Sequence, residues 1–264
     1  MPAEFIDRWQ YRAEPEPDQG LFYWHMLVGH HPEVVAVARN AQERLVPFAG
    51  LHLTPLRWLH MTTLIAGPAD TISAHDAEQM AAVAARLLAS ASPVTVTFGK
   101  VLYHPEAIML AATPPDVLDP VREAIKAATR EGTGTDGQAA HDGPWTPHVT
   151  LCYSTSRQPA APVIAALGRY LPAVEVQISE VSLVIQHGPE RRWDWEPVAT
   201  VRLGGLPVRP GRPGARIRCR HCHSEGRCRS GMSWPVISPG WTIRPARNAS
   251  SAVSLIRMLR RPIR

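Results

Sequence analysis

Two short stretches of the sequence each pair a histidine with a threonine two residues later. The first pair is His60 and Thr62, the second is His148 and Thr150, and both lie in apolar runs. In a β-strand, residues i and i+2 point to the same face, so each histidine should project beside its threonine. Histidine can donate or accept a proton near neutral pH, and a threonine hydroxyl can donate a hydrogen bond to an anion. The pairs therefore predict two half-sites facing one ligand.

Breaking a phosphodiester, or opening a cyclic phosphate, requires groups of these types. A base deprotonates the attacking water or hydroxyl, an acid protonates the leaving oxygen, and hydrogen-bond donors hold the non-bridging oxygens. We interpret His60 and His148 as the catalytic acid and base, and Thr62 and Thr150 as phosphate-binding residues. Two histidines on opposite sides of one phosphorus suit in-line displacement without a metal, so neither a metal nor a cofactor is expected.

A third stretch, His52-Leu53-Thr54, has the same His-x-Thr pattern but different flanking residues. Pro55 follows it directly, which disfavours a central strand, and it has no downstream partner motif. We therefore leave His52 outside the predicted site.

Two further side chains are candidates for substrate contact. His25 lies in an aromatic strand-like run, and Tyr153 lies five residues after His148. For both, packing in the core or at a sheet edge is the open alternative.

Hydrophobic periodicity predicts strands and helices that alternate along residues 21–204. Strands are expected over 21–28, 58–65, 94–98, 107–112, 148–153, 174–178, 181–185 and 198–203. Helices are expected over 32–45, 74–90, 116 or 119 to 130, and 162–171. The second half of this order loosely echoes the first. It predicts an α+β fold of two pseudo-symmetric lobes with mainly antiparallel sheets.

The charge of the chain is divided unevenly. Residues 209–264 hold thirteen arginines, no lysine and one acidic residue, which leaves 15 basic and 22 acidic side chains in residues 1–208. A net charge of −7 on the expected folded part argues against a surface that tracks a long nucleic acid. It favours a small or terminal phosphate ligand.

Composition divides the chain into an N-terminal extension over 1–20, a two-lobed domain over 21–204 and a tail over 205–264. The tail is rich in Arg and Pro and is expected to be disordered. It contains a zinc-type group of Cys219, Cys222, His223 and Cys228, but no surrounding pattern that would build a metal domain, so whether the group binds metal stays open. No apolar run is long enough to span a membrane, and the first eight residues carry acids rather than an apolar stretch. A cytoplasmic monomer is expected.

The paired motifs resemble those of the two-histidine phosphoesterase superfamily, in particular its 2′-5′ RNA ligase and cyclic phosphodiesterase branch. That group carries one His-x-Thr/Ser-x motif per lobe, and here the motifs lie 88 residues apart, which fits one lobe length. The resemblance covers roughly residues 21–204. Some bacterial relatives carry a basic residue five positions after the second motif histidine, where this chain has Tyr153.

The resemblance implies a central cleft between the lobes and metal-independent chemistry on 2′,3′-cyclic or 2′-5′ phosphodiesters. Its expected partner is a small nucleotide or an RNA end. Hydrolysis and reversible 2′-5′ ligation would use the same histidines. Two alternatives stay open: a non-catalytic binder of phosphorylated RNA ends or nucleotides, and an RNA-associated protein that binds through its arginine-rich tail.

Overall fold

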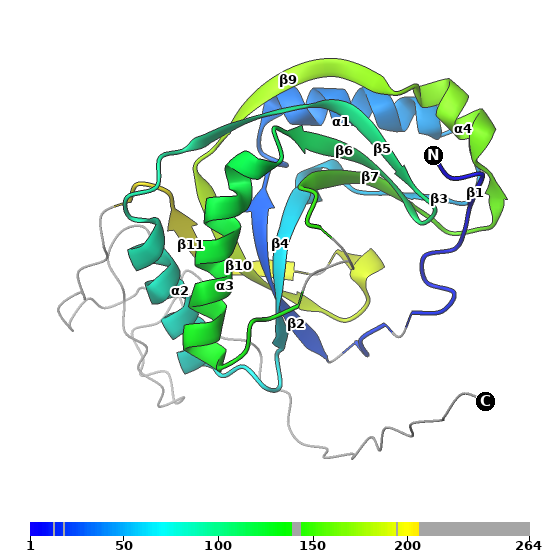
Figure 1. Ribbon diagram of the computed structural model, residues 1–264. Coiled ribbons are helices and arrows are strands. Elements are labelled where there is room, and N and C mark those ends of the chain that lie inside the picture. Colours follow the sequence, from blue (N-terminus) through cyan, green and yellow to red (C-terminus); the bar gives the residue numbers. More distant parts are fainter. Residues whose placement is uncertain (13, 18, 139–143, 194, 206–264) are drawn as a thin grey trace, which may run out of the picture.

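The computed structural model describes residues 1–205, apart from residues 13, 18, 139–143 and 194 (Figure 1). Nearly all of the predicted tail, with its zinc-type group of Cys219, Cys222, His223 and Cys228, lies outside the described residues. None of the helices described is both long and apolar enough to cross a membrane.

Helices and antiparallel strands follow one another along the described chain much as the hydrophobic periodicity predicts. The helix expected over 162–171 is an exception, because it ends at Leu167 and a strand begins at Tyr170. The helices are α1 (Pro32–Leu45), α2 (Ala74–Leu88), α3 (Asp119–Thr133) and α4 (Ala160–Leu167), with short 3₁₀ helices η1 (Leu56–Trp58), η2 (Asp116–Leu118) and η3 (Glu190–Arg192). The strands are β1 (Glu4–Phe5), β2 (Gly20–Leu27), β3 (Leu51–Leu53), β4 (His60–Pro68), β5 (Val94–His104), β6 (Ala107–Thr113), β7 (His148–Ser154), β8 (Gln158–Pro159), β9 (Tyr170–Ile178), β10 (Glu180–His187) and β11 (Trp195–Arg202).

Four strands form one antiparallel sheet in the order β11-β10-β2-β4. Strand β2 lies between strands from distant parts of the chain, because His25 pairs with Ser182 of β10 on one side and with Thr62 of β4 on the other. Helices α2 and α3 lie side by side and pack against this sheet (Figure 1). We call this sheet with α2 and α3 the first lobe.

Five strands form a second antiparallel sheet in the order β3-β7-β6-β5-β9. Helix α1 packs against its strands β7 and β9 and also against α4 (Figure 1). We call this sheet with α1 and α4 the second lobe. The predicted α+β fold with two antiparallel lobes is confirmed. Neither lobe is a continuous half of the sequence. Helix α1 and strand β3 of the second lobe precede β4 of the first, and β10 and β11 return from the end of the described chain to complete the first.

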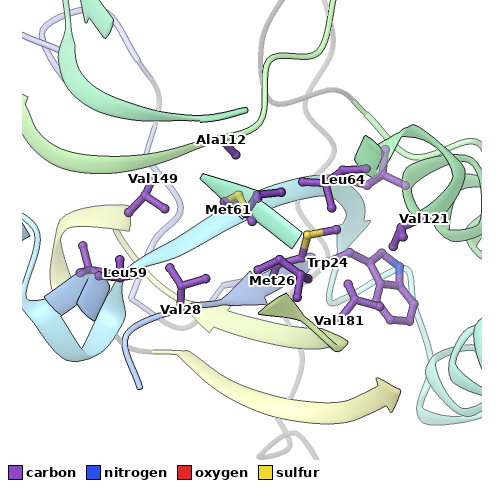
Figure 2. Close-up of a cluster of buried hydrophobic side chains, with 14 of the residues drawn as sticks. Trp24, Met26, Val28, Leu59, Met61, Leu64, Ala112, Val121, Val149 and Val181 are labelled. Carbon is purple, nitrogen blue, oxygen red and sulfur yellow. The ribbon is translucent and has the colours of Figure 1, made fainter. Parts of the chain in front are cut away.

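The hydrophobic core is continuous between the two lobes. Figure 2 shows a part of it, which includes Met26 of β2, Met61 of β4 and Val149 of β7, all at most 1% exposed. Burying a side chain of this size contributes about 1.5–3 kcal/mol. The two motif strands therefore belong to one packed unit, which holds the lobes in a defined relation.

The local signals in the sequence explain several boundaries of these elements. Helix α1 begins at Pro32, since a proline suits the first turn of a helix, where its missing N–H is not needed. Helix α2 begins after Ser73, whose hydroxyl accepts from the Asp76 amide while the Asp76 carboxylate accepts from the Ser73 amide. Strand β3, which contains His52, lies at the edge of its sheet and pairs, among the described strands, with β7, as the proline that follows it predicts.

The first residues of the chain pack against the second lobe. Strand β1 pairs with β8, the side chain of Phe5 is fully buried, and the Arg8 amide donates to the Ser154 carbonyl at 3.0 Å. The segment that the composition set apart as an extension is thus in contact with the strand that carries the second motif. The division of the chain at residues 20 and 204 stays a prediction.

Candidate active site

Side chains from both lobes line one cavity of about 720 Å³. His60 and Thr62 enter it from β4, and His148 and Thr150 enter it from β7. The structure thus brings together all four residues of the two predicted half-sites, which lie 88 positions apart in the sequence.

The alternation of the two motif strands explains this placement. Met61 and Val149 follow the two histidines directly, point to the opposite face and are fully buried in the core. Because strand side chains alternate between faces, burial of these two residues turns the histidines and threonines towards the cavity. A shift of either strand by one residue would bury the polar pair and expose the apolar one, so the core itself sets the register of the site.

The two histidines are held in the same way. The Nδ1 atom of His60 lies 2.6 Å from the carbonyl oxygen of Trp58, and Nδ1 of His148 lies 2.7 Å from that of Thr146. A carbonyl oxygen can only accept, so Nδ1 carries the proton in both rings. In each neutral imidazole the lone pair is therefore on Nε2, which is the nitrogen available for proton transfer.

Burial lowers the pKa of both imidazoles below the ordinary histidine value. For each ring, loss of contact with water is the largest cause, since it disfavours the charged form, and the hydrogen bond to the carbonyl oxygen opposes it. Positive charge on His148 lowers the pKa of His60 further, whereas the carboxylate of Glu190 raises it. The charge of Arg8 lowers the pKa of His148. Both rings are predominantly neutral at pH 7, a form suited to proton acceptance.

The backbone before His60 is fixed by a close approach at the end of β2. The amides of Val28 and Gly29 both donate to the Leu59 carbonyl, at 2.9 and 3.0 Å. A Cβ atom on Gly29 would lie 2.6 Å from the carbonyl oxygen of Arg57, so only glycine fits at this crossing. This close approach of Gly29 to Arg57 fixes the position of η1. It thereby fixes the Trp58 carbonyl group, which orients the His60 ring.

Trp145 joins the two half-sites directly. It precedes β7, lines the cavity and donates from Nε1 to the carbonyl oxygen of Thr62 at 3.1 Å. The segment that leads into the second motif is thereby tied to the strand of the first.

Tyr153 also lines the cavity, where it belongs to a buried polar network. Its hydroxyl donates to Oε1 of Glu190 at 3.1 Å. Arg8 donates to the same carboxylate from two nitrogens, at 2.8 and 3.0 Å, and its guanidinium carbon lies 4.3 Å from the centre of the Tyr153 ring. Burial alone would raise the pKa of Glu190, but the hydrogen bonds and charge of Arg8, with the Tyr153 hydroxyl, leave it below its usual value.

Arg8 brings a positive charge next to Tyr153, the residue that occupies the position where some bacterial relatives carry a basic residue. The charge comes from the segment before β2, and Arg8 is only 8% exposed. A second carboxylate, that of Glu106, lies 3.3 Å from Arg8 and 2.5 Å from Arg12. Sequence reasoning missed Arg8 and Glu190, because no local motif marks either residue and they lie 182 positions apart.

The two other histidines considered from the sequence, His25 and His52, are not among the residues that line the cavity. His25 is 2% exposed and lies behind His60, with the two ring centres 4.2 Å apart. Burial places its pKa well below the ordinary value. His52 accepts a hydrogen bond from Nε1 of Trp193 at 3.2 Å and packs against Trp9. The described contacts of His25 are therefore packing contacts beneath a catalytic candidate.

The described residues contain no group of three or more His, Cys, Asp or Glu side chains placed to hold a metal ion. The zinc-type group of the tail lies beyond them.

Fold and site together define a class of protein: two lobes, each with one histidine–threonine pair, around a shared cavity, as in the two-histidine phosphoesterases. Residues 32–190, more than half of the chain, match the sequence profile of the 2′-5′ RNA ligase superfamily. The chain belongs to this family. Membership indicates an enzyme of the phosphoesterase or RNA-ligase type. No curated protein sequence matches the chain significantly.

Solved structures share the fold at low sequence identity. TT0787 of Thermus thermophilus is 20% identical, with a TM-score of 0.52, over 70% of this chain and 98% of its own. E. coli LigT complexed with 3′-AMP is 14% identical, with a TM-score of 0.53, over 70% and 98% of the two chains. The LigT complex with ATP is 15% identical, with a TM-score of 0.53, over 70% and 99%. These likenesses establish the shared architecture.

Proposed function

We propose that the protein is a metal-independent phosphodiesterase that acts on 2′,3′-cyclic or 2′-5′ RNA-type phosphodiesters by two-histidine acid–base catalysis. The observation that carries the proposal is the matched geometry of His60 and His148. Each imidazole is oriented by a carbonyl oxygen two residues earlier, and each lies beside a threonine in one cavity. The nucleotides bound by E. coli LigT, 3′-AMP and ATP, support a small nucleotide as the ligand.

In hydrolysis of a 2′,3′-cyclic phosphate, Nε2 of one neutral histidine takes a proton from water. The water oxygen bonds to phosphorus while the bond from phosphorus to one ribose oxygen breaks. The other histidine, protonated, gives its Nε2 proton to that oxygen. Thr62 and Thr150 donate hydrogen bonds to the non-bridging oxygens. When a ribose hydroxyl of a second RNA end replaces the water, the same steps join the two RNA ends through a phosphodiester. Ligation therefore requires no further catalytic group.

The direct test is an assay of the purified protein on 2′,3′-cyclic nucleotides and on 2′-5′-linked dinucleotides, each with and without EDTA. Turnover is expected in both conditions, since the proposed steps use only side chains of the chain itself. Complete loss of turnover in EDTA, restored by a divalent ion, would contradict the metal-independent mechanism. Tight nucleotide binding without turnover would favour the non-catalytic binder instead.

The pH dependence should differ between kcat/KM and kcat. A bell-shaped profile is expected for both, because one histidine must be neutral and the other charged. The pKa values of the free protein are lowered, so the limbs of the kcat/KM profile should lie below about pH 6.5. A bound phosphate anion favours the charged imidazole and raises these pKa values, which shifts the kcat profile to higher pH. The limbs belong to the coupled pair rather than to either ring.

Steady-state kinetics from the acid limb through neutral to alkaline pH would measure both profiles. A rate that rises steadily over the whole range would remove the acid–base pair from the mechanism.

A further inference from the structure

The cavity continues beyond the two half-sites, towards helix α3. Trp145 is hydrogen-bonded to the backbone of Thr62, and the guanidinium carbon of Arg122 in α3 lies over the Trp145 ring, 5.2 Å from its centre. Arg122 and Trp145 both line the cavity. None of the steps proposed for the two histidines uses either side chain.

The charges around the cavity single out Arg122. Three arginines and two glutamates line it, although the whole of residues 1–208 carries more acidic than basic side chains. Arg8 is paired with Glu190 and Glu106, and Arg12 is paired with Glu106. Among the described residues, the Arg122 side chain has no carboxylate partner, and its buried Nε atom has no hydrogen-bond acceptor. Arg122 is therefore the lining cation whose charge the described part of the chain leaves uncompensated.

The chemistry of this arrangement fits an anion. A guanidinium offers a planar set of donors that match the oxygens of a phosphate, and stacking on tryptophan holds its orientation in advance. A buried N–H without an acceptor is unfavourable, so a ligand oxygen that reaches it is favoured. Because the guanidinium covers one face of Trp145, that face is closed to a stacked base.

We propose that Arg122, held against Trp145, forms a subsite for a second phosphate of the substrate, next to the phosphate that lies between His60 and His148. The proposal rests on the proposed function and narrows its substrate class. Substrates would be nucleotides or short oligonucleotides with a phosphate besides the reacting one, either at a terminus or in a neighbouring phosphodiester link. A lone cyclic mononucleotide would use only part of the cavity.

Binding measurements test the subsite without relying on turnover. Isothermal titration calorimetry would compare adenosine 3′-monophosphate with adenosine 3′,5′-bisphosphate on the full-length protein. The bisphosphate should bind the wild type at least about tenfold more tightly, since a charge-assisted bidentate contact is among the stronger hydrogen-bonding arrangements. Arg122→Met, which keeps the apolar stem against Trp145, should reduce this preference to about twofold or less. Arg122→Lys should keep an intermediate preference, because it keeps the charge but loses the planar donors.

The matched control is Arg130→Met, on the same helix. Arg130 is exposed, is paired with Asp136 and does not line the cavity. This variant should keep the full preference. Equal loss in Arg130→Met and Arg122→Met would mean that the overall charge of the protein, rather than a subsite, attracts the second phosphate, and would overturn the proposal. A wild type without preference for the bisphosphate would overturn it directly, even if Arg122→Met failed to fold.

A third ligand, a dinucleotide that ends in a 3′-phosphate, separates the two sources of the second phosphate. Binding as tight as that of the bisphosphate identifies a neighbouring phosphodiester, whereas weaker binding identifies a terminal phosphate. Failure of the subsite and failure of the proposed function remain distinguishable. Turnover of cyclic nucleotides without the binding preference removes only the subsite, and the preference without any turnover removes only the phosphodiesterase activity.

Discussion

Replacing His60 or His148 by alanine is expected to lower kcat/KM on a confirmed phosphodiester substrate by about 10²–10⁴ for each variant. Each change removes one of the two Nε2 atoms that carry protons in the proposed reaction. It also removes the Nδ1 hydrogen bond, but that bond joins residues only two positions apart, so the fold should stay intact. Because the two histidines act on one phosphate, the double variant should lose little more than the worse single variant. Steady-state kinetics on the three variants would measure this.

His52→Ala is the matched control, since His52 has the same motif spelling but does not line the cavity. It should keep kcat/KM within a few-fold once the folded fraction is taken into account. Circular dichroism of every variant would separate lost chemistry from lost structure. Near-normal turnover in His60→Ala or His148→Ala would remove that residue from the mechanism.

Replacing Arg8 by alanine is expected to lower the free energy of unfolding by about 3 kcal/mol. Arg8 is 8% exposed, and its removal leaves the Glu190 carboxylate without two hydrogen bonds and the Tyr153 ring without its stacked cation. Urea denaturation at pH 7 would measure the loss. The double variant Arg8→Met with Glu190→Gln should lose less than the sum of the single variants, because it removes both charges together.

The same ion pair predicts how stability depends on pH. The folded state holds the pKa of Glu190 below its unfolded value, so the stabilisation is fully present above about pH 4.5, the ordinary range of a glutamate. It is lost as the pH falls through the folded pKa. The difference in the free energy of unfolding between the wild type and Arg8→Ala should therefore become smaller under acid conditions. A gap that stays constant down to the acid unfolding transition would show that Arg8 stabilises the fold by packing alone.

The two histidine–threonine pairs could be predicted from the sequence because each pair lies within one short stretch of chain. A histidine and a threonine two residues apart in an apolar strand must share a face, and the buried Met61 and Val149 confirm which face that is. Helix α1 also has the bounds that its proline and apolar periodicity predict, Pro32–Leu45. In these cases one short stretch of chain carries the whole signal.

The remaining part of the site depends on contacts between distant segments. Arg8 contacts Glu190 across 182 positions, and Trp145 contacts Thr62 across 83. Neither contact leaves a pattern in its own surroundings, since an isolated arginine or tryptophan is as consistent with the surface or the core as with a cavity. For His25, the alternation of its strand predicted which face the side chain lies on. It did not predict that the His60 ring would pack against it.

The order of the strands has a consequence for the synthesis of the protein. The lobe that carries His60 is completed by β10 and β11, so β2 has an unpaired edge until residues 180–202 have left the ribosome. Such an edge, here bearing Phe22 and Tyr23, invites pairing with other chains, and long-range pairing of this kind folds slowly. The carboxylate of Glu190 is made just as late, and it closes onto an arginine that emerged first. The cavity can therefore be completed only after β10, Glu190 and β11 have emerged, and a nascent chain that stalls before β10 would carry both histidines without a completed site.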